Sequence, residues 1–350
     1  MGEFWHGGDV ITAEEIYGGG IVDFSANFNP LGMPPEVRKA AEEAVAESVH
    51  YPDPFCRELV FGLAEREGVN REYILCGNGA ADLIFRLVYA KRPRLAVVMA
   101  PTFAEYAQAL EMAGCEVLHH RLKEAKGFEL TDEILDYLTY ETDMLFLCNP
   151  NNPTGRPVPP KLMDQVVKIC RERKISLVVD ECFVELADGP RSLTPRVPNN
   201  PHLFLLKAFT KSYCMAGLRL GYCVTADEDL LDRMRLCGQP WSVSHPAQRA
   251  GIAALQLSEY PERARAIIRE ERGWLEGELQ NLGVTVFPSC TNYIMFRAAN
   301  IYDLRERMTG KGILIRSCAN FLGLGDDYYR VAVKLRDENE RLIRVMKEVF

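Results

Sequence analysis

The sequence predicts an α/β protein in which a large domain, with a mainly parallel sheet flanked by helices, precedes a small α+β C-terminal domain. Short continuous apolar runs recur along the chain up to residue 224, and amphipathic stretches of helical length separate them. This alternation is typical of βαβ units, whose parallel strands are buried on both faces. After Trp241 the pattern changes to a long charged helical stretch and two short strands, which is typical of a smaller α+β unit.

The individual elements follow from the period of the apolar residues. Strands are predicted for the continuous apolar runs at residues 95–100, 144–148, 175–179, 203–206 and 220–224. Amphipathic crossover helices are predicted at residues 104–113 and 161–173. A long helix at 261–282, strands near 284–287 and 292–296, and a helix from Asp337 complete the chain. We therefore expect an N-terminal arm (1–35) that contributes to the small domain and the active site, a large domain (36–245) and a small C-terminal domain (246–350).

Length, charge and cysteine content restrict the class of protein. A chain of 350 residues with 47% apolar composition is long enough to bury a full core. The net charge of -8 provides no chain-wide attraction to nucleic acid or to an anionic membrane. The 11 cysteines show no CxxC pair and no metal-like spacing with histidine, which is typical of reduced thiols in a cytoplasmic protein. This spacing also leads us to expect no metal site. We expect no secretion, because no basic start precedes an apolar run, and no membrane span, because no apolar stretch is long enough.

Polar segments follow three of the predicted strands. The segment 149–155 (NPNNPTG) follows one apolar run, Asp180 and Glu181 follow another, and the segment 208–212 (AFTKS) follows a third. In open α/β sheets, ligands bind beyond the carboxyl ends of the strands. These segments are therefore the first candidates for a binding site.

The candidates match the parts that a pyridinium electron sink requires. Asp180 is suited to keep a ring nitrogen protonated, and Lys211 is suited to form an imine and to shuttle protons. Arg219 is a fixed cation for a phosphate dianion. The segment 77–82 (GNGAAD) precedes a helical stretch, so its backbone N–H groups are predicted to cradle phosphate, and Phe103 is suited to stack on the ring.

Each of these features has a simpler explanation when it is taken alone. A glycine-rich turn before a helix is usually only a turn, and a lone lysine is usually a solvated surface charge. An aspartate at the end of a strand is often a helix cap, and Asn-Pro-Thr-Gly is an ordinary turn sequence. The prediction therefore depends on the whole set and on its order along the chain.

The order GNGAAD, PTFAEY, NPNNPTG, VVDE and FTKSYCMAGLRLGY resembles the fold-type I enzymes that use pyridoxal 5'-phosphate (PLP), specifically the aspartate aminotransferase superfamily. By this resemblance Lys211 is the Schiff-base lysine, Asp180 pairs with the pyridine nitrogen, and Asn152 hydrogen-bonds the ring hydroxyl. The resemblance also implies that Phe103 stacks on the ring. The residues that it implies for the cofactor phosphate are Gly79, Ala80 and Ala81 of the GNGAAD turn, with Thr210 and Arg219. Tyr51, in HYPDP, resembles the tyrosine that reaches the phosphate of the neighbouring subunit, which implies a homodimer with shared active sites.

Two subgroups share these motifs, the histidinol-phosphate aminotransferases and the L-threonine O-3-phosphate decarboxylases of cobalamin biosynthesis. The segments 23–32 (DFSANFNPLG) and 314–334, with the early His6, resemble the decarboxylases. The aminotransferases more often carry an acidic residue where Phe28 stands and a tyrosine where Phe183 stands. The resemblance therefore favours decarboxylation of L-threonine O-3-phosphate to (R)-1-amino-2-propanol O-2-phosphate, with serine phosphate as a second substrate.

The substrate side of the site is assigned mainly by the same resemblance. Arg330, in YYRVAV, is the implied carboxylate clamp, aided by Asn152 and Asn27, and its simpler explanation is an ion pair at the rim. The further cations nominated for the substrate phosphate are His6, Arg316 and Lys334. Two alternatives stay open at this point, an aminotransferase of the histidinol-phosphate type or another class I/II type, and a PLP-binding protein without catalysis.

Overall fold

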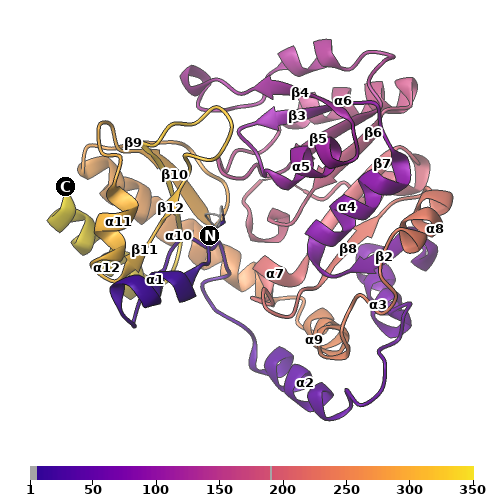
Figure 1. Ribbon diagram of the computed structural model, residues 1–350, viewed down its shortest axis with the longest axis horizontal. Helices are drawn as coiled ribbons and strands as arrows, with labels where there is room; N and C mark the ends of the chain where they lie inside the picture. The colour runs from indigo at the N-terminus through magenta and orange to yellow at the C-terminus, as the bar shows by residue number, and fades with distance from the viewer. Residues whose placement is uncertain (1–5, 190) are drawn as a thin grey trace.

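The computed structural model describes residues 6–189 and 191–350, and Figure 1 shows them arranged as a larger and a smaller lobe. The strands of the larger lobe are β2 (Ile74–Gly77), β3 (Leu95–Ala100), β4 (Glu116–Arg121), β5 (Met144–Cys148), β6 (Ser176–Asp180), β7 (Leu203–Ala208) and β8 (Gly221–Val224). They form one seven-stranded sheet in the order β2-β8-β7-β6-β5-β3-β4. Neighbours from β7 to β4 run parallel, whereas β8 runs antiparallel to both β7 and β2.

Helices cover both faces of this sheet. Those of the larger lobe are α2 (Pro35–Ala46), α3 (Arg57–Glu67), α4 (Gly79–Lys91), α5 (Glu105–Met112), α6 (Pro160–Arg173), α7 (Phe209–Ser212), α8 (Glu228–Leu236) and α9 (His245–Leu255). Along β5, Leu145 and Leu147 pack with α3, α6 and α9, while Phe146 packs on the opposite face with α4, α5 and α8. Because successive strand residues point to opposite faces, a strand covered on both sides is apolar throughout.

The smaller lobe has its own antiparallel sheet and its own core. Its four-stranded sheet has the order β12-β13-β10-β9, and β1 of the N-terminal arm pairs in parallel with β11. Its elements are α1 (Val10–Tyr17), β1 (Val22–Asp23), α10 (Tyr260–Asn281), β9 (Thr285–Val286), β10 (Tyr293–Arg297), α11 (Leu304–Thr309), β11 (Ile313–Leu314), β12 (Arg316–Ser317), β13 (Tyr328–Ala332) and α12 (Arg336–Val349). Phe24, Phe296 and Tyr329 lie fully buried in the core that these elements enclose.

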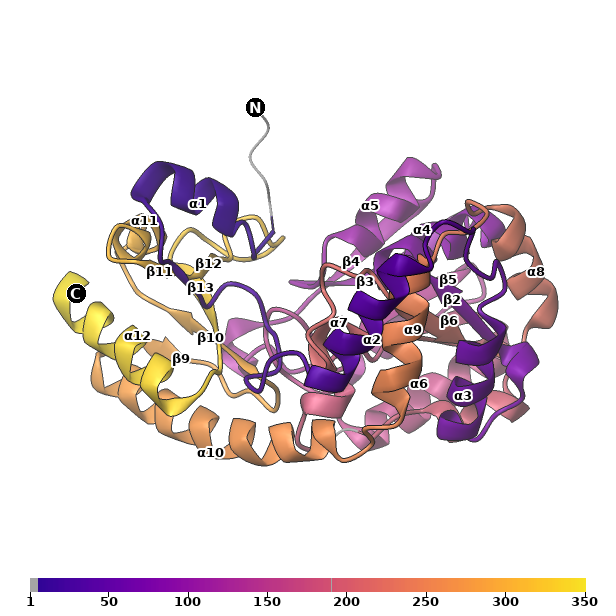
Figure 2. The same ribbon diagram turned by 90° about the horizontal axis from the view of Figure 1, so that it is seen from below.

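The long helix α10 connects the two lobes. In Figure 2 it runs along the lower side of the smaller lobe and reaches the near edge of the larger lobe, with α12 beside its far end. Its first half packs Ala264 and Ile268 against Leu186 of the larger lobe, and its second half contributes Leu275 and Leu279 to the core of the smaller lobe. The helix therefore fixes the position of the smaller lobe beside the strand ends.

The α/β class with a mainly parallel sheet is confirmed, and every predicted strand and helix exists within a few residues of its expected bounds. The antiparallel direction of β8 differs from the prediction, and β1, β2, β4, β11, β12 and β13 were not predicted. The domain limits remain a proposal, and the packing of α9 against α2 and α3 favours a boundary near the start of α10 rather than at residue 245. Short 3-10 helices lie at Arg71–Tyr73, Glu124–Lys126, Asp132–Tyr137, Val184–Leu186 and Thr194–Asn199.

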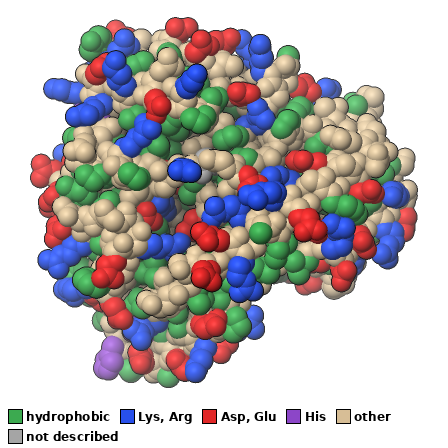
Figure 3. Space-filling model, turned by 180° about the vertical axis from the view of Figure 1, so that it is seen from behind, with side chains coloured by type: hydrophobic (Ala, Val, Ile, Leu, Met, Phe, Trp, Pro, Cys, Tyr) green, Lys and Arg blue, Asp and Glu red, His purple; other side chains and the backbone are tan. Residues whose placement is uncertain are grey.

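Two further observations concern the surface. In the described part of the chain, no helix combines the length and the apolar character that a membrane crossing requires. Figure 3 shows the face opposite to that of Figure 1, where Lys and Arg side chains are interspersed with Asp and Glu. Charges of both signs on one face do not form an extended basic track for a polyanion.

Candidate active site

Lys211 lies in α7, the single helical turn that directly follows β7. Its Nζ lies 5.0 Å from the ring centroid of Phe28 and 5.8 Å from that of Phe183. Burial, together with the positive charges of Arg330 and Arg219, lowers the pKa of Lys211 to about 8. A lysine amine with a lowered pKa is more often neutral near pH 7, and the neutral amine is the form that attacks a carbonyl.

Asp180 ends β6 and is buried. Its Oδ2 accepts a hydrogen bond of 2.6 Å from the hydroxyl of Tyr106, and its Oδ1 accepts one of 2.9 Å from the backbone N–H of Cys182. Burial and then the negative charge of Asp180 raise the pKa of Tyr106, so this hydroxyl stays protonated and donates the hydrogen bond. The two donors fix the direction of the carboxylate.

The turn after β2 and the segment before β8 form a cradle for an anion. Gly79, with φ of 79°, begins α4, and a Cβ built on it would lie 2.6 Å from Nη2 of Arg219. The pairing of Gly77 with Gly221 across β2 and β8 brings these two segments together. A helix N-terminus beside a guanidinium favours phosphate through both the backbone N–H groups and the charge. The nominated Ala80 and Ala81 occupy the first turn of α4, and Thr210 precedes Lys211 in α7.

Arg330, on β13, is buried and reaches across to the larger lobe. Its Nη1 donates to Oδ1 of Asn152, and its Nη2 donates to the carbonyl oxygen of Ser25 at 2.7 Å. Burial lowers the pKa of Arg330. Within residues 6–189 and 191–350, the Nε of Arg330 and the Oδ1 of Asn27 are buried without a hydrogen-bond partner. Buried polar atoms are rarely left without partners, so this donor and this acceptor indicate a place for a polar ligand.

The three cations nominated for a substrate phosphate lie in different surroundings. His6 contacts Oε1 of Glu105 at 2.9 Å, and Lys334 contacts Oε1 of Glu338 at 2.7 Å. Arg316 is paired with Arg330 in the register of β12 and β13. Burial and then the charge of Arg330 lower the pKa of Arg316 to about 10. His6 and Arg316 line one cavity of about 350 Å³, so the structure brings these two together.

Two nominated aromatic residues have contrasting positions. Phe103 is partly buried, and its ring contacts the edge of Tyr106 at a centroid distance of 5.5 Å. Tyr51 is 78% exposed, and the ring contact that it makes in the described part of the chain is a stack on Trp241 at 4.4 Å. The structure therefore brings Phe103 to Asp180 through Tyr106, and it leaves Tyr51 on the surface of this subunit.

Sequence reasoning missed two tyrosines that support the site. Tyr106 holds Asp180, and the hydroxyl of Tyr293 donates to the carbonyl oxygen of Asn151 at 2.9 Å while its ring lies 5.4 Å from the guanidinium of Arg330. The only available signal for Tyr106 was its place in PTFAEY, three residues after Phe103. Tyr293 begins β10 and carried no motif at all.

The two-lobed α/β fold, with a lysine, a carboxylate and an anion cradle at its strand ends, is that of the fold-type I PLP enzymes. The family model for aminotransferases of class I and II matches residues 20–345, and the chain belongs to that family. Threonine-phosphate decarboxylase of Salmonella typhimurium is 40% identical over 350 residues, covering 99% of this chain and 96% of its own.

Two solved structures have the same fold over most of the chain. L-Threonine-O-3-phosphate decarboxylase from Porphyromonas gingivalis has a TM-score of 0.84 at 26% identity, and the match covers 94% of this chain and 99% of that one. Histidinol-phosphate aminotransferase from Clostridium acetobutylicum has a TM-score of 0.87 at 28% identity, covering 93% of this chain and 98% of that one. The fold alone therefore does not separate the two activities.

Proposed function

We propose that this chain binds PLP and decarboxylates L-threonine O-3-phosphate to (R)-1-amino-2-propanol O-2-phosphate in cobalamin biosynthesis, in the cytoplasm. The observation that carries the reaction type is the full-length similarity to the Salmonella decarboxylase, at 40% identity over 99% of this chain. The observations that support the cofactor are the lowered pKa of Lys211 and the anion cradle at Gly79 and Arg219.

The residues fit the cofactor group by group. Lys211 would hold its aldehyde carbon, Asp180 would keep the ring nitrogen protonated, and Phe103 would stack on the ring. The residues proposed for its phosphate are Gly79, Ala80, Ala81, Thr210 and Arg219, with Asn152 at the ring hydroxyl. When bound, the cofactor supplies a sink for the electron pair left at Cα after bond cleavage. After the substrate amine takes its place, Lys211 Nζ is the proposed donor of the proton that Cα receives.

The direction of the substrate carboxylate decides which bond at Cα breaks, because only the bond perpendicular to the ring overlaps its π system. Arg330 presents a buried guanidinium whose Nε is unpartnered within residues 6–189 and 191–350. The group of Asn27 that can donate to a carboxylate is its Nδ2, because an amide oxygen only accepts. We propose that Arg330, with Asn152 and Asn27, holds the carboxylate in that direction. Binding of the substrate phosphate at a second point fixes the torsion.

For the substrate phosphate we propose His6, Arg316 and Lys334. The shared cavity of His6 and Arg316 supports these two more strongly, and Lys334 has to exchange its contact with Glu338 for the phosphate. Serine phosphate lacks one methyl group of threonine phosphate. Since one methyl group in a pocket is worth only about 1–3 kcal/mol, we propose serine phosphate as a slower second substrate.

We also propose that two copies of the chain share their active sites, with Tyr51 reaching the cofactor phosphate of its neighbour. The support is an exposed aromatic pair, because Tyr51 is 78% exposed and its stacking partner Trp241 is 44% exposed. Large exposed aromatic side chains in one place are typical of an interface. Light scattering at micromolar concentration tests this proposal, and a monomeric mass would contradict it.

The deciding experiment uses PLP-loaded protein with L-threonine O-3-phosphate and no 2-oxo acid. We expect catalytic release of CO2 and accumulation of the phosphorylated amine, both followed by mass spectrometry. Transamination cannot turn over without an acceptor, so continued CO2 release assigns decarboxylation. Lys211→Ala is the matched control and should release none.

The second candidate function is histidinol-phosphate transamination. The observation that favours it is the TM-score of 0.87 with the Clostridium aminotransferase. Absence of CO2 release, together with consumption of histidinol phosphate once 2-oxoglutarate is added, would assign this activity instead.

A further inference from the structure

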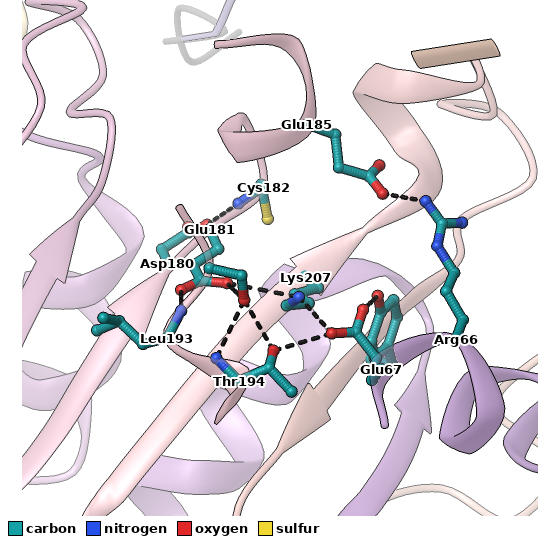
Figure 4. Close-up of polar contacts among 11 residues, drawn as sticks. Arg66, Glu67, Asp180, Glu181, Cys182, Glu185, Leu193, Thr194 and Lys207 are labelled. Carbon is teal, nitrogen blue, oxygen red and sulfur yellow. Dashed lines mark hydrogen bonds and ion pairs between the residues drawn. The ribbon is translucent and has the colours of Figure 1, made fainter. Parts of the chain in front are cut away.

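A cluster of buried charges adjoins the segment that carries Asp180, as Figure 4 shows. Lys207 Nζ contacts Oε2 of Glu67 at 2.6 Å and Oε2 of Glu181 at 3.5 Å. The side chains of these residues are 10%, 9% and 0% exposed, respectively. None of the three groups has a role in the reaction proposed above, so the cluster requires a separate explanation.

The cluster is closed by further hydrogen bonds. Glu181 accepts from the hydroxyl of Ser192 at 2.6 Å and from the backbone N–H of Leu193 at 2.7 Å. Glu67 accepts from the hydroxyls of Tyr222 at 2.6 Å and Thr194 at 2.8 Å. Each carboxylate therefore has at least two donors besides the ammonium, which is the condition under which buried charges are tolerated.

The members of the cluster are neighbours in sequence of the proposed cofactor residues. Glu181 follows Asp180 directly, and Lys207 precedes Lys211 by four residues at the end of β7. Tyr222 lies on β8, three residues after Arg219. Strands β7 and β8 are thus tied directly to Glu67, the last residue of α3, and the end of β6 is tied to it through Lys207.

A second contact pair extends the same connection to the far side of Lys211. Arg66 pairs with Glu185 and donates from Nη1 to the hydroxyl of Tyr213 at 3.1 Å. Tyr213 lies two residues after Lys211 and is fully buried. The turn that carries Lys211 is therefore anchored on both sides, at Lys207 and at Tyr213, to neighbouring residues of α3.

Stability alone does not account for such a cluster. Replacing a buried ion pair by apolar groups of similar volume is often neutral or stabilising, whereas removing one partner is strongly destabilising. The charges also do not balance, because one ammonium faces two carboxylates. Burial raises the pKa of Glu181, while Lys207 and hydrogen bonds from Lys207, Tyr222 and Thr194 lower that of Glu67 against the effect of burial. Unlike apolar packing, the cluster fixes the direction of each strand end through its hydrogen bonds.

We propose that Lys207, held between Glu67 and Glu181, is a positioning residue that fixes Asp180 and Lys211 relative to each other at the cofactor. This inference rests on the proposed function only in taking these two residues as the cofactor-binding pair. Lys207 acts through the backbone of β6 and β7 and does not touch the cofactor itself. A displacement of about 1 Å at a reacting group costs roughly 100-fold in rate, so a small shift of either strand end is enough to be measured.

The test compares Lys207→Met with a neutral triple variant, Lys207→Met with Glu67→Gln and Glu181→Gln. Lys207→Met leaves two buried carboxylates unpaired and should lower the melting temperature. The triple variant removes every unpaired charge and should recover it. We expect kcat to stay roughly 10- to 100-fold below wild type in the triple variant with KM unchanged.

A second readout needs no substrate. The absorbance of bound PLP is followed against pH, and the fraction that borohydride fixes to the chain is measured. We expect the pH midpoint of the absorbance change to move in the triple variant and to move back toward wild type in Lys207→Arg, which restores the charge. Lys91→Met is the matched control, because Lys91 forms a half-buried pair with Asp227 at 2.9 Å and should leave the midpoint unchanged.

A triple variant with wild-type melting temperature, kcat and pH midpoint would overturn the proposal. If the triple variant does not recover its melting temperature, Lys207→Met is measured at a temperature where it is folded, and an unmoved midpoint in that variant also overturns the proposal. Because the spectral readout involves PLP alone, wild-type protein that binds PLP without releasing CO2 contradicts the decarboxylase assignment and leaves this inference testable. Wild-type protein that takes up no PLP contradicts both.

Discussion

Replacement of Arg330 by methionine tests the substrate side of the site most directly. The guanidinium makes two hydrogen bonds within the protein, to Asn152 and Ser25, and its Nε is free for a ligand within the described residues. A charge-assisted hydrogen bond contributes about 1.5–3 kcal/mol, so loss of two such bonds to a carboxylate costs roughly 3–6 kcal/mol. We therefore expect kcat/KM for L-threonine O-3-phosphate to fall by about 10²–10⁴.

The effect on folding should be much smaller than the effect on catalysis. Methionine fills much of the same volume and removes a charge whose burial is unfavourable, as the lowered pKa of Arg330 indicates. The assay is initial-rate CO2 release, with the affinity for PLP measured in parallel. Arg297→Met is the control, since Arg297 lies on the adjacent strand β10 and pairs with Asp327 at 2.6 Å. A loss of less than tenfold in kcat/KM, with PLP bound normally, would refute the assignment of Arg330 as the carboxylate clamp.

Four further predictions concern the cofactor side. Tyr106→Phe removes the hydroxyl donor to Asp180, so we expect it to destabilise the fold by about 1–3 kcal/mol and to weaken PLP binding. Urea unfolding measures the first effect and absorbance titration the second. Tyr329→Phe in the smaller lobe is the control and should affect only stability. Gly79→Ala places a Cβ 2.6 Å from Arg219 Nη2 at a φ of 79°, so the dissociation constant for PLP should rise. The rate of PLP uptake by cofactor-free protein should rise with pH around the pKa of about 8 of Lys211, because the neutral amine is the reactive form. Since folding lowers this pKa from 10.5, the folded state binds fewer protons, and the melting temperature of cofactor-free wild type relative to Lys211→Met should increase from about pH 8 to about pH 10.5.

The sequence was sufficient to predict the central strands because both of their faces are buried. A strand such as β5 is apolar at every position, so its bounds can be read directly from the chain. The edge strand β4 (EVLHHR) is half-exposed and carries a charge at each end, so it has no such pattern. The direction of β8 was also out of reach, because burial gives the same apolar run in parallel and antiparallel strands.

Candidate site residues could be chosen from the sequence where they follow a strand and belong to a motif, as Asp180 and Lys211 do. Their supports were not predictable, because the partners are distant in sequence. The hydroxyl of Tyr106 reaches Asp180 across 74 positions, and the Lys207–Glu67 contact spans 140. In the sequence, Lys207 is typical of a solvated residue at the end of a strand, because the carboxylates that pair with it lie on other elements.

Arg330 also shows why the site depends on both lobes at once. The residue lies on β13 of the smaller lobe, yet its hydrogen bonds go to Asn152 of the larger lobe and to Ser25 of the N-terminal arm. Lys211 is connected to the same arm, because its carbonyl oxygen accepts from the backbone N–H of Asn29 at 3.0 Å. A ligand that completes the partners of Arg330 therefore strengthens contacts among three segments, and by linkage it must stabilise their joint arrangement. In the role proposed for Arg330, substrate affinity and this arrangement of the lobes are coupled through one guanidinium.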